Sequence, residues 1–297
     1  MRYMPEVARK KMTLPDGDVS YLEWEADAPL LHFTHATGFN AETYRALLTP
    51  LQGRFHVAAA DMRGHGFTTL PATPGPQAAW ANFAHDLEAI LGQLDAAPAY
   101  LAGHSMGAIV SMMVAAQFPQ RVRGLVLIEP VLVPRFSRQI MTLMRLIGRR
   151  PPGGSNLAEM AAKRRAIFPS FEMALSAYRG RGAFKTWPEA TLADYLHGGL
   201  LPTGNGTEMQ LACAPAWESA IFQNAPPGGA RLAKQVRCPL TLIYAEASNT
   251  TRAHEVAIIA SLHRGARIVQ VPGTTHFLPM ERPDIVQDEI ERMARAG

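Results

Sequence analysis

The sequence of 297 residues has little cysteine and no long apolar run. It contains two cysteines, Cys213 and Cys238. Such sparse usage favours a reducing compartment over a disulfide-built secreted scaffold, with a disulfide between the two as the minor alternative. No stretch approaches the roughly 20 apolar residues of a membrane helix, and residues 1–12 lack the apolar core of a signal peptide. These features predict a soluble, cytoplasmic protein without stable membrane association.

The sequence also has little excess of one charge over the other. Its net charge is only +4, and charged residues make up 18% of the chain. The longest basic clusters, residues 9–11 and 163–165, are interpreted as solvated surface, and no nucleic-acid partner is expected. The 47% of hydrophobic residues supports a sizeable core and excludes a disordered chain. No metal-ligand cluster, glycine-rich phosphate loop or dinucleotide fingerprint occurs in the sequence, so no metal and no cofactor are predicted.

What the sequence does contain is an alternation of short apolar runs with longer segments of helical spacing. This alternation is typical of an α/β architecture, in which a mostly parallel central sheet is flanked by helices. The expected strands are residues 30–34, 56–60, 99–103, 125–128, 240–244 and 268–271. The expected helices are residues 77–94, 106–118 and 283–296.

Between residues 133 and 229 the strand signal disappears. Several helical stretches separated by proline and glycine take its place. The sequence therefore predicts a core formed by residues 1–132 and 230–297, with residues 133–229 as a helical cap inserted between the two parts.

Residues 103–107 read Gly-His-Ser-Met-Gly and lie where an expected strand gives way to an expected helix. This is the G-x-S-x-G nucleophile elbow in its required context. A serine on a sharp strand-to-helix turn needs neighbours without side chains, and the helix start beside it offers backbone N–H groups to an anion. Ser105 is therefore the candidate nucleophile.

With this motif the chain resembles the α/β-hydrolase family over most of its length outside the insertion. Residues 35–39 follow the first buried strand, where the family carries a His-Gly turn that completes the oxyanion hole. Ala36 replaces the usual glycine here, and Gly38 offers backbone freedom nearby. The resemblance implies that the backbone N–H groups of Thr37 and Met106 bind the oxyanion.

Residues 272–283 resemble the family's catalytic-histidine loop and imply that His276 is the general base. Residues 61–66 resemble the family's D-x-R-G-x-G segment. Asp61 and Arg63 are interpreted as structural, and His65 as a residue that orders the loop, with a place facing the pocket as its alternative.

The acid departs from the family pattern. The family places an aspartate after the strand at 240–244, but Ser248 and Asn249 stand there in this chain. A histidine that becomes charged needs a buried carboxylate to hold its tautomer. Glu129, which follows the strand at 125–128, is the first candidate, since some haloalkane dehalogenases and the zearalenone lactonases carry their acid at this strand. Glu246 is the alternative, followed by a water-mediated or other acid.

The insertion begins where this family places its cap. The side chains of the insertion are therefore expected to cover Ser105 and to form the substrate pocket. Met141 and Met144 suggest an adaptable apolar wall, and Trp187 and Trp217 suggest rigid aromatic surfaces. Packing of the cap on the core is the alternative role for these side chains.

These features predict a serine hydrolase that acts on a small molecule, a carboxylic ester or lactone with an apolar moiety, through an acyl-enzyme on Ser105. Hydrolysis of a carbon–carbon bond or a thioester by the same triad is one alternative. The other is a small-molecule receptor with little turnover, which the missing acid after residues 240–244 keeps open. The sequence leaves the oligomeric state undetermined.

Overall fold

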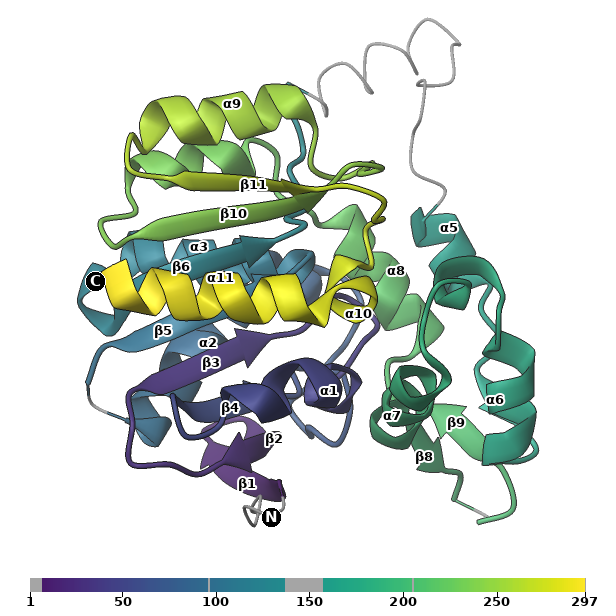
Figure 1. The fold of residues 1–297 in the computed structure, drawn as a ribbon. Helices are drawn as coiled ribbons and strands as arrows, with labels where there is room; N and C mark the ends of the chain where they lie inside the picture. The colour runs from purple at the N-terminus through teal and green to yellow at the C-terminus, as the bar shows by residue number, and fades with distance from the viewer. Residues whose placement is uncertain (1–6, 96, 137–156, 205, 297) are drawn as a thin grey trace, which may run out of the picture.

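A computed structural model describes residues 7–95, 97–136, 157–204 and 206–296 and contains a central eight-stranded sheet (Figure 1). The strand order is β1-β2-β4-β3-β5-β6-β10-β11. The strands are β1 (Ala8–Leu14), β2 (Gly17–Trp24), β3 (Leu30–Thr34), β4 (His56–Ala60), β5 (Ala99–His104), β6 (Val122–Ile128), β10 (Leu240–Ala245) and β11 (Arg267–Val271). Within this sheet, as far as the structure describes it, only β1 with β2 and β2 with β4 pair antiparallel, so the predicted mostly parallel sheet is confirmed.

All six expected strands are present, and β3 and β4 have the predicted bounds. The hairpin of β1 and β2 was not predicted. In β1 exposed and buried side chains alternate, and Arg9, Lys10 and Lys11 interrupt its apolar positions. Such an edge strand lacks the continuous apolar run by which the buried parallel strands were recognised.

Helices cover both faces of the sheet. One face carries α2 (Trp80–Leu94), α3 (Met106–Gln117) and α9 (Ala253–Leu262), and the other carries α1 (Arg45–Leu48) and α11 (Pro283–Ala296) (Figure 1). The helix α11 has the predicted bounds, and α2 starts three residues later than predicted because the 3₁₀ turn η3 (Pro76–Ala78) precedes it. Two buried apolar clusters, one on each face, form the core.

The insertion lies between β6 and β10 and stands beyond the carboxyl ends of the parallel strands (Figure 1). Its described helices are α5 (Leu157–Ala162), α6 (Phe171–Tyr178), α7 (Glu189–Gly199) and α8 (Pro215–Gln223). The insertion also contains a small antiparallel sheet that was not predicted, formed by β7 (Ile167–Phe168), β9 (Met209–Leu211) and β8 (Leu200–Pro202). Strands of two or three residues are too short to show a period in sequence.

The remaining described elements are short connections. They are α10 (Leu278–Glu281) and the 3₁₀ turns η1 (Ala41–Tyr44), η2 (Thr49–Leu51), η4 (Pro119–Arg121), η5 (Gly182–Phe184) and η6 (Gly229–Lys234). Within the described ranges, no helix combines the length and the apolar character needed to span a membrane.

Candidate active site

Ser105 occupies a sharp turn between β5 and α3. Its φ of 58° lies in the left-handed region, a strain of about 1–3 kcal/mol that is found mainly at functional sites. A methyl group on Gly107 would overlap the carbonyl oxygen of Thr34, and one on Gly103 would overlap that of Gly107. The two glycines therefore allow α3 to start directly against β3 and β5, which holds the serine at the end of the sheet.

His276 lies in the loop between β11 and α10. Its Nε2 is 3.0 Å from Ser105 Oγ, within hydrogen-bond reach for a base and its nucleophile. The Ser105 residue is 5% exposed and the His276 side chain 20% exposed, so water reaches the imidazole more readily than the hydroxyl. The structure thus brings together the two residues that the sequence marked as nucleophile and base.

Glu129 follows β6 directly and completes the contact with His276. Its side chain is fully buried, and its Oε2 lies 3.0 Å from His276 Nδ1. Its φ is 48°, and in the described ranges Ser105 is the one other non-glycine residue with positive φ. Glu246, the alternative acid, is exposed and accepts a hydrogen bond from the Gly273 N–H at 2.9 Å. Geometry therefore places Glu129, and not Glu246, beside the histidine.

The Glu129 carboxylate is held by groups at the end of β10 and just after it. The Ala245 N–H donates to Oε1 at 2.6 Å, and the hydroxyls of Ser248 and Thr250 donate to Oε2 at 2.8 and 3.1 Å. These hydrogen bonds offset the cost of burying a carboxylate and fix its orientation. Ser248 is one of the two residues, with Asn249, that stand where the sequence resemblance leads one to expect the family's aspartate, and it donates to Glu129. Sequence reasoning missed Ser248 and Thr250 in this role, and the signal was the cluster of hydroxyls at the end of β10.

The turn of residues 36–39 lies at the carboxyl end of β3. Three of its N–H groups are used: Ala36 donates to the Tyr44 hydroxyl, Gly38 to His65 Nε2, and Phe39 to the Ala36 carbonyl. The Thr37 N–H has no acceptor among the described residues. The positive φ of 77° falls on Gly38, which explains how the turn tolerates alanine at position 36.

Met106 is the first residue of α3, and the first N–H groups of a helix have no partner inside the helix. The N–H groups of Thr37 and Met106 remain the predicted pair of oxyanion donors.

Of the predicted pocket residues that the structure describes, Trp187 contacts aromatic neighbours of the candidate triad. Its ring centroid is 5.3 Å from that of Phe39 and 5.8 Å from that of Phe277, the residue next to His276. Trp217 instead stacks on Phe83 and donates to the Arg63 carbonyl, so it packs the insertion onto the core. Met141 and Met144 lie outside the described residues.

The expectation that the basic clusters are solvated was wrong for Arg164, whereas Arg9 is exposed as expected. The Arg164 guanidinium lies 2.6 Å from the Glu218 carboxylate and 2.8 Å from the Tyr195 hydroxyl, with 21% of its side chain exposed. Arg9 pairs with the fully buried carboxylate of Asp61 at 2.8 Å. Residue clusters in sequence do not reveal partners that the fold supplies from distant segments.

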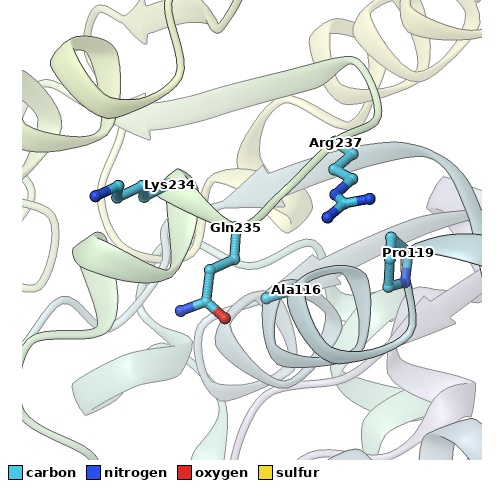
Figure 2. A pocket seen from close by; sticks show the side chains of 5 residues that line it. All are labelled: Ala116, Pro119, Lys234, Gln235 and Arg237. Atoms are coloured by element: carbon cyan, nitrogen blue, oxygen red, sulfur yellow. The ribbon is translucent and has the colours of Figure 1, made fainter.

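A surface hollow of about 460 Å³ lies away from this site (Figure 2). The residues lining it are Ala116, Pro119, Lys234, Gln235 and Arg237. Ala116 is near the last turn of α3, at the opposite end of the helix from Ser105. Within the described part of the chain, no group of three or more His, Cys, Asp or Glu side chains could hold a metal ion.

Comparison with known proteins places the chain in a family. The model of the family described as "Alpha/beta hydrolase family" matches residues 32–289. The chain belongs to the alpha/beta hydrolase family. The sheet order, the elbow and the insertion described above are those of an alpha/beta hydrolase, so the predicted fold is confirmed.

Individual relatives of this alpha/beta hydrolase span nearly the whole chain. It is 26% identical to 2-(acetamidomethylene)succinate hydrolase of Mesorhizobium japonicum, over 88% of this chain and 86% of that protein. The crystal structure of E-2-(acetamidomethylene)succinate hydrolase covers 98% of this chain and 100% of its own, with a TM-score of 0.81 and 22% identity. The thioesterase domain from the curacin biosynthetic pathway covers 97% of this alpha/beta hydrolase and 100% of its own chain, with a TM-score of 0.79 and 19% identity.

Proposed function

We propose that this protein is a serine hydrolase that cleaves a carboxylic ester or lactone with an apolar part through an acyl-enzyme on Ser105. The observation that carries the proposal is the continuous hydrogen-bonded line from Ser105 Oγ through His276 to Glu129, with both contacts at 3.0 Å. A nucleophile, a base and an acid in this order are recognised by their geometry, whatever strand supplies the acid.

In the first half of the reaction the Ser105 hydroxyl attacks the acyl carbonyl while His276 Nε2 takes its proton. The carbonyl oxygen becomes an oxyanion that accepts hydrogen bonds from the N–H groups of Thr37 and Met106. Glu129 holds the Nδ1–H of the imidazolium. His276 then gives its proton to the leaving alkoxide, and an acyl-enzyme remains on Ser105.

Water completes the cycle. His276 takes a proton from a water molecule, the resulting hydroxide attacks the acyl-enzyme carbonyl, and the proton returns to Ser105 Oγ as the carboxylic acid leaves. Trp187, Phe39 and Phe277 form an aromatic group beside the histidine, which supports a substrate with an apolar part.

The receptor alternative depended on a missing acid. A buried carboxylate in contact with His276 supports turnover instead, as does membership of a hydrolase family.

A second candidate substrate is an N-acyl compound such as 2-(acetamidomethylene)succinate. It is favoured by the relative of that name, which matches 88% of this chain. The same Ser105 chemistry applies to it, with the leaving nitrogen taking the proton from His276 in place of an alkoxide.

The test combines labelling with turnover. Wild type, Ser105→Ala and Ser111→Ala are treated with a fluorophosphonate and analysed by mass spectrometry, then assayed on p-nitrophenyl esters of increasing acyl length, a lactone, an acyl thioester and 2-(acetamidomethylene)succinate. Ser111 is a buried serine of α3, the helix that directly follows Ser105, and serves as the matched control. We expect labelling and turnover in wild type and Ser111→Ala and neither in Ser105→Ala. A folded wild-type protein that is not labelled would contradict the proposal.

A further inference from the structure

Tyr44 and His104 form a buried pair that the proposed reaction does not use. Tyr44 ends the turn η1, and His104 is the last residue of β5, next to Ser105. The Tyr44 hydroxyl lies 2.8 Å from His104 Nδ1. The Tyr44 and His104 residues are 1% and 0% exposed.

This pair contacts the backbone of both other parts of the site. The Ala36 N–H, next to Thr37, donates to the Tyr44 oxygen at 3.1 Å. His104 Nε2 lies 2.8 Å from the carbonyl oxygen of His276. Two side chains thus join the oxyanion turn, the residue before the nucleophile and the backbone of the base.

The direction of each hydrogen bond follows from chemistry. The His276 carbonyl can only accept, so His104 Nε2 carries a proton and donates it. The Ala36 N–H can only donate, so the Tyr44 oxygen accepts it. A neutral His104 then has a lone pair on Nδ1, which accepts the Tyr44 O–H. Burial, and then the nearby His276, lower the pKa of His104 well below its ordinary value, which agrees with the neutral form.

The backbone on the other side of Thr37 is also held by a side chain. Gly38, two residues beyond Ala36, is held on its other side by His65 Nε2 at 3.0 Å. Both neighbours of Thr37 are thus held by side chains from other segments, which restricts the orientation of the Thr37 N–H. Oxyanion donors act only when they are held where charge develops, and a displacement of about 1 Å costs about 100-fold in rate.

We infer that Tyr44 and His104 are positioning residues that couple the oxyanion turn to the base, so that the Thr37 N–H and His276 keep a fixed relation to Ser105. The inference rests on the proposed function, because it assigns a task within the reaction at Ser105. Neither side chain touches the substrate in this scheme. Loss of the link weakens transition-state binding and leaves ground-state binding unchanged.

The first test compares Tyr44→Phe with Tyr100→Phe. Tyr100 is also a buried tyrosine, but its hydroxyl donates to the carbonyl of Ala294 on α11, in a separate part of the fold. We expect Tyr44→Phe to lower kcat about 10- to 100-fold with KM within about twofold, and Tyr100→Phe to change neither by more than about twofold. An aryl boronic acid, which adds to Ser105 as a transition-state analogue, should lose affinity for Tyr44→Phe by the same factor as kcat.

A second pair of variants keeps the inference testable if Tyr44→Phe does not fold. His104→Gln retains a donor and an acceptor, whereas His104→Leu has neither, so kcat should fall less in the glutamine variant. The pH dependence of kcat/KM should keep its wild-type shape in His104→Gln, since the contact between His276 and Glu129 is intact.

The outcomes separate the two proposals. A wild-type protein that is not labelled at Ser105 by a fluorophosphonate overturns the proposed function, and the inference with it. A labelled wild type whose folded Tyr44→Phe and His104→Leu variants keep kcat and boronate affinity within about twofold overturns the inference alone. A rise in KM with unchanged kcat does so as well, because it would mean that these residues support substrate binding or the fold and not the transition state.

Discussion

Lowering the pH from 8 to 5 is predicted to destabilise this protein strongly because of its buried histidines. Four histidines, His32, His35, His65 and His104, are at most 1% exposed. Burial lowers the pKa of each, to about 3 for His32 and about 4 for His65. In the unfolded chain a histidine has a pKa of about 6.5.

The direction in which the unfolding free energy changes with pH follows from the number of protons that each state binds. Below about pH 6.5 the histidines of the unfolded chain bind protons, whereas those buried in the folded protein stay neutral. Stability therefore falls as the pH drops toward the pKa values of the buried histidines in the folded protein. At pH 5 the loss is about 2 kcal/mol for each of His32 and His65, and His35 and His104 add to it in the same direction. Burial raises the pKa of Asp61, which offsets part of this loss. The contribution of His32 and His65 alone, about 4 kcal/mol, is large beside the 5–15 kcal/mol stability of a typical protein.

The assay is urea unfolding followed by tryptophan fluorescence at pH 8, 7, 6 and 5. The variant His32→Phe removes one titrating group whose buried Nε2 has no partner among the described residues. Its loss of unfolding free energy between pH 8 and 5 should be about 2 kcal/mol smaller than that of wild type. His85→Asn, at an exposed histidine, leaves the buried set intact and is the control. An unfolding free energy that stays constant from pH 8 to 5 would refute this reasoning.

Three further predictions concern single side chains. Glu129→Gln should lower kcat about 10⁴-fold, as loss of a triad acid does, while Glu246→Gln stays near wild type; steady-state assays on an aryl ester decide between them. Arg164→Met should destabilise the fold by up to about 3 kcal/mol in urea unfolding, because it leaves the Glu218 carboxylate unpaired, whereas the exposed Arg165→Met should stay within about 0.5 kcal/mol. Trp187→Ala should raise KM for esters that carry an aromatic group more than for alkyl acetates. An equal change in KM for both kinds of ester would argue against a pocket role.

Much of the core could be predicted because its strands are buried on both sides. The residues of β3 and β4 form short apolar runs between turn residues, and both strands have the predicted bounds. The hairpin of β1 and β2 lies at the edge of the sheet, where charged side chains break the pattern. Hydrophobicity along the chain reports burial, so it finds central strands better than edge strands.

The candidate site was predictable where local motifs specify it. The elbow glycines and the loop around His276 are contiguous in sequence, and the absence of an aspartate after β10 led to Glu129. The donors to that carboxylate were not predictable, because Ser248 is an ordinary loop serine until the fold brings it 2.8 Å from Glu129. Arg164 was misread for the same reason, since its partners Glu218 and Tyr195 are separated from it by 54 and 31 residues.

The insertion also determines when this protein can become active during its synthesis. Glu129 precedes the insertion, but the three groups that donate to its carboxylate follow 116 to 121 residues later, on and after β10. A nascent chain that has only just completed the insertion therefore has a carboxylate without its donors, and the sheet at β6 still has an open edge. Long-range pairing of this kind is slow and exposes the chain to aggregation. The elbow can form early, but the base and the donors to the acid arrive only with the last fifth of the chain.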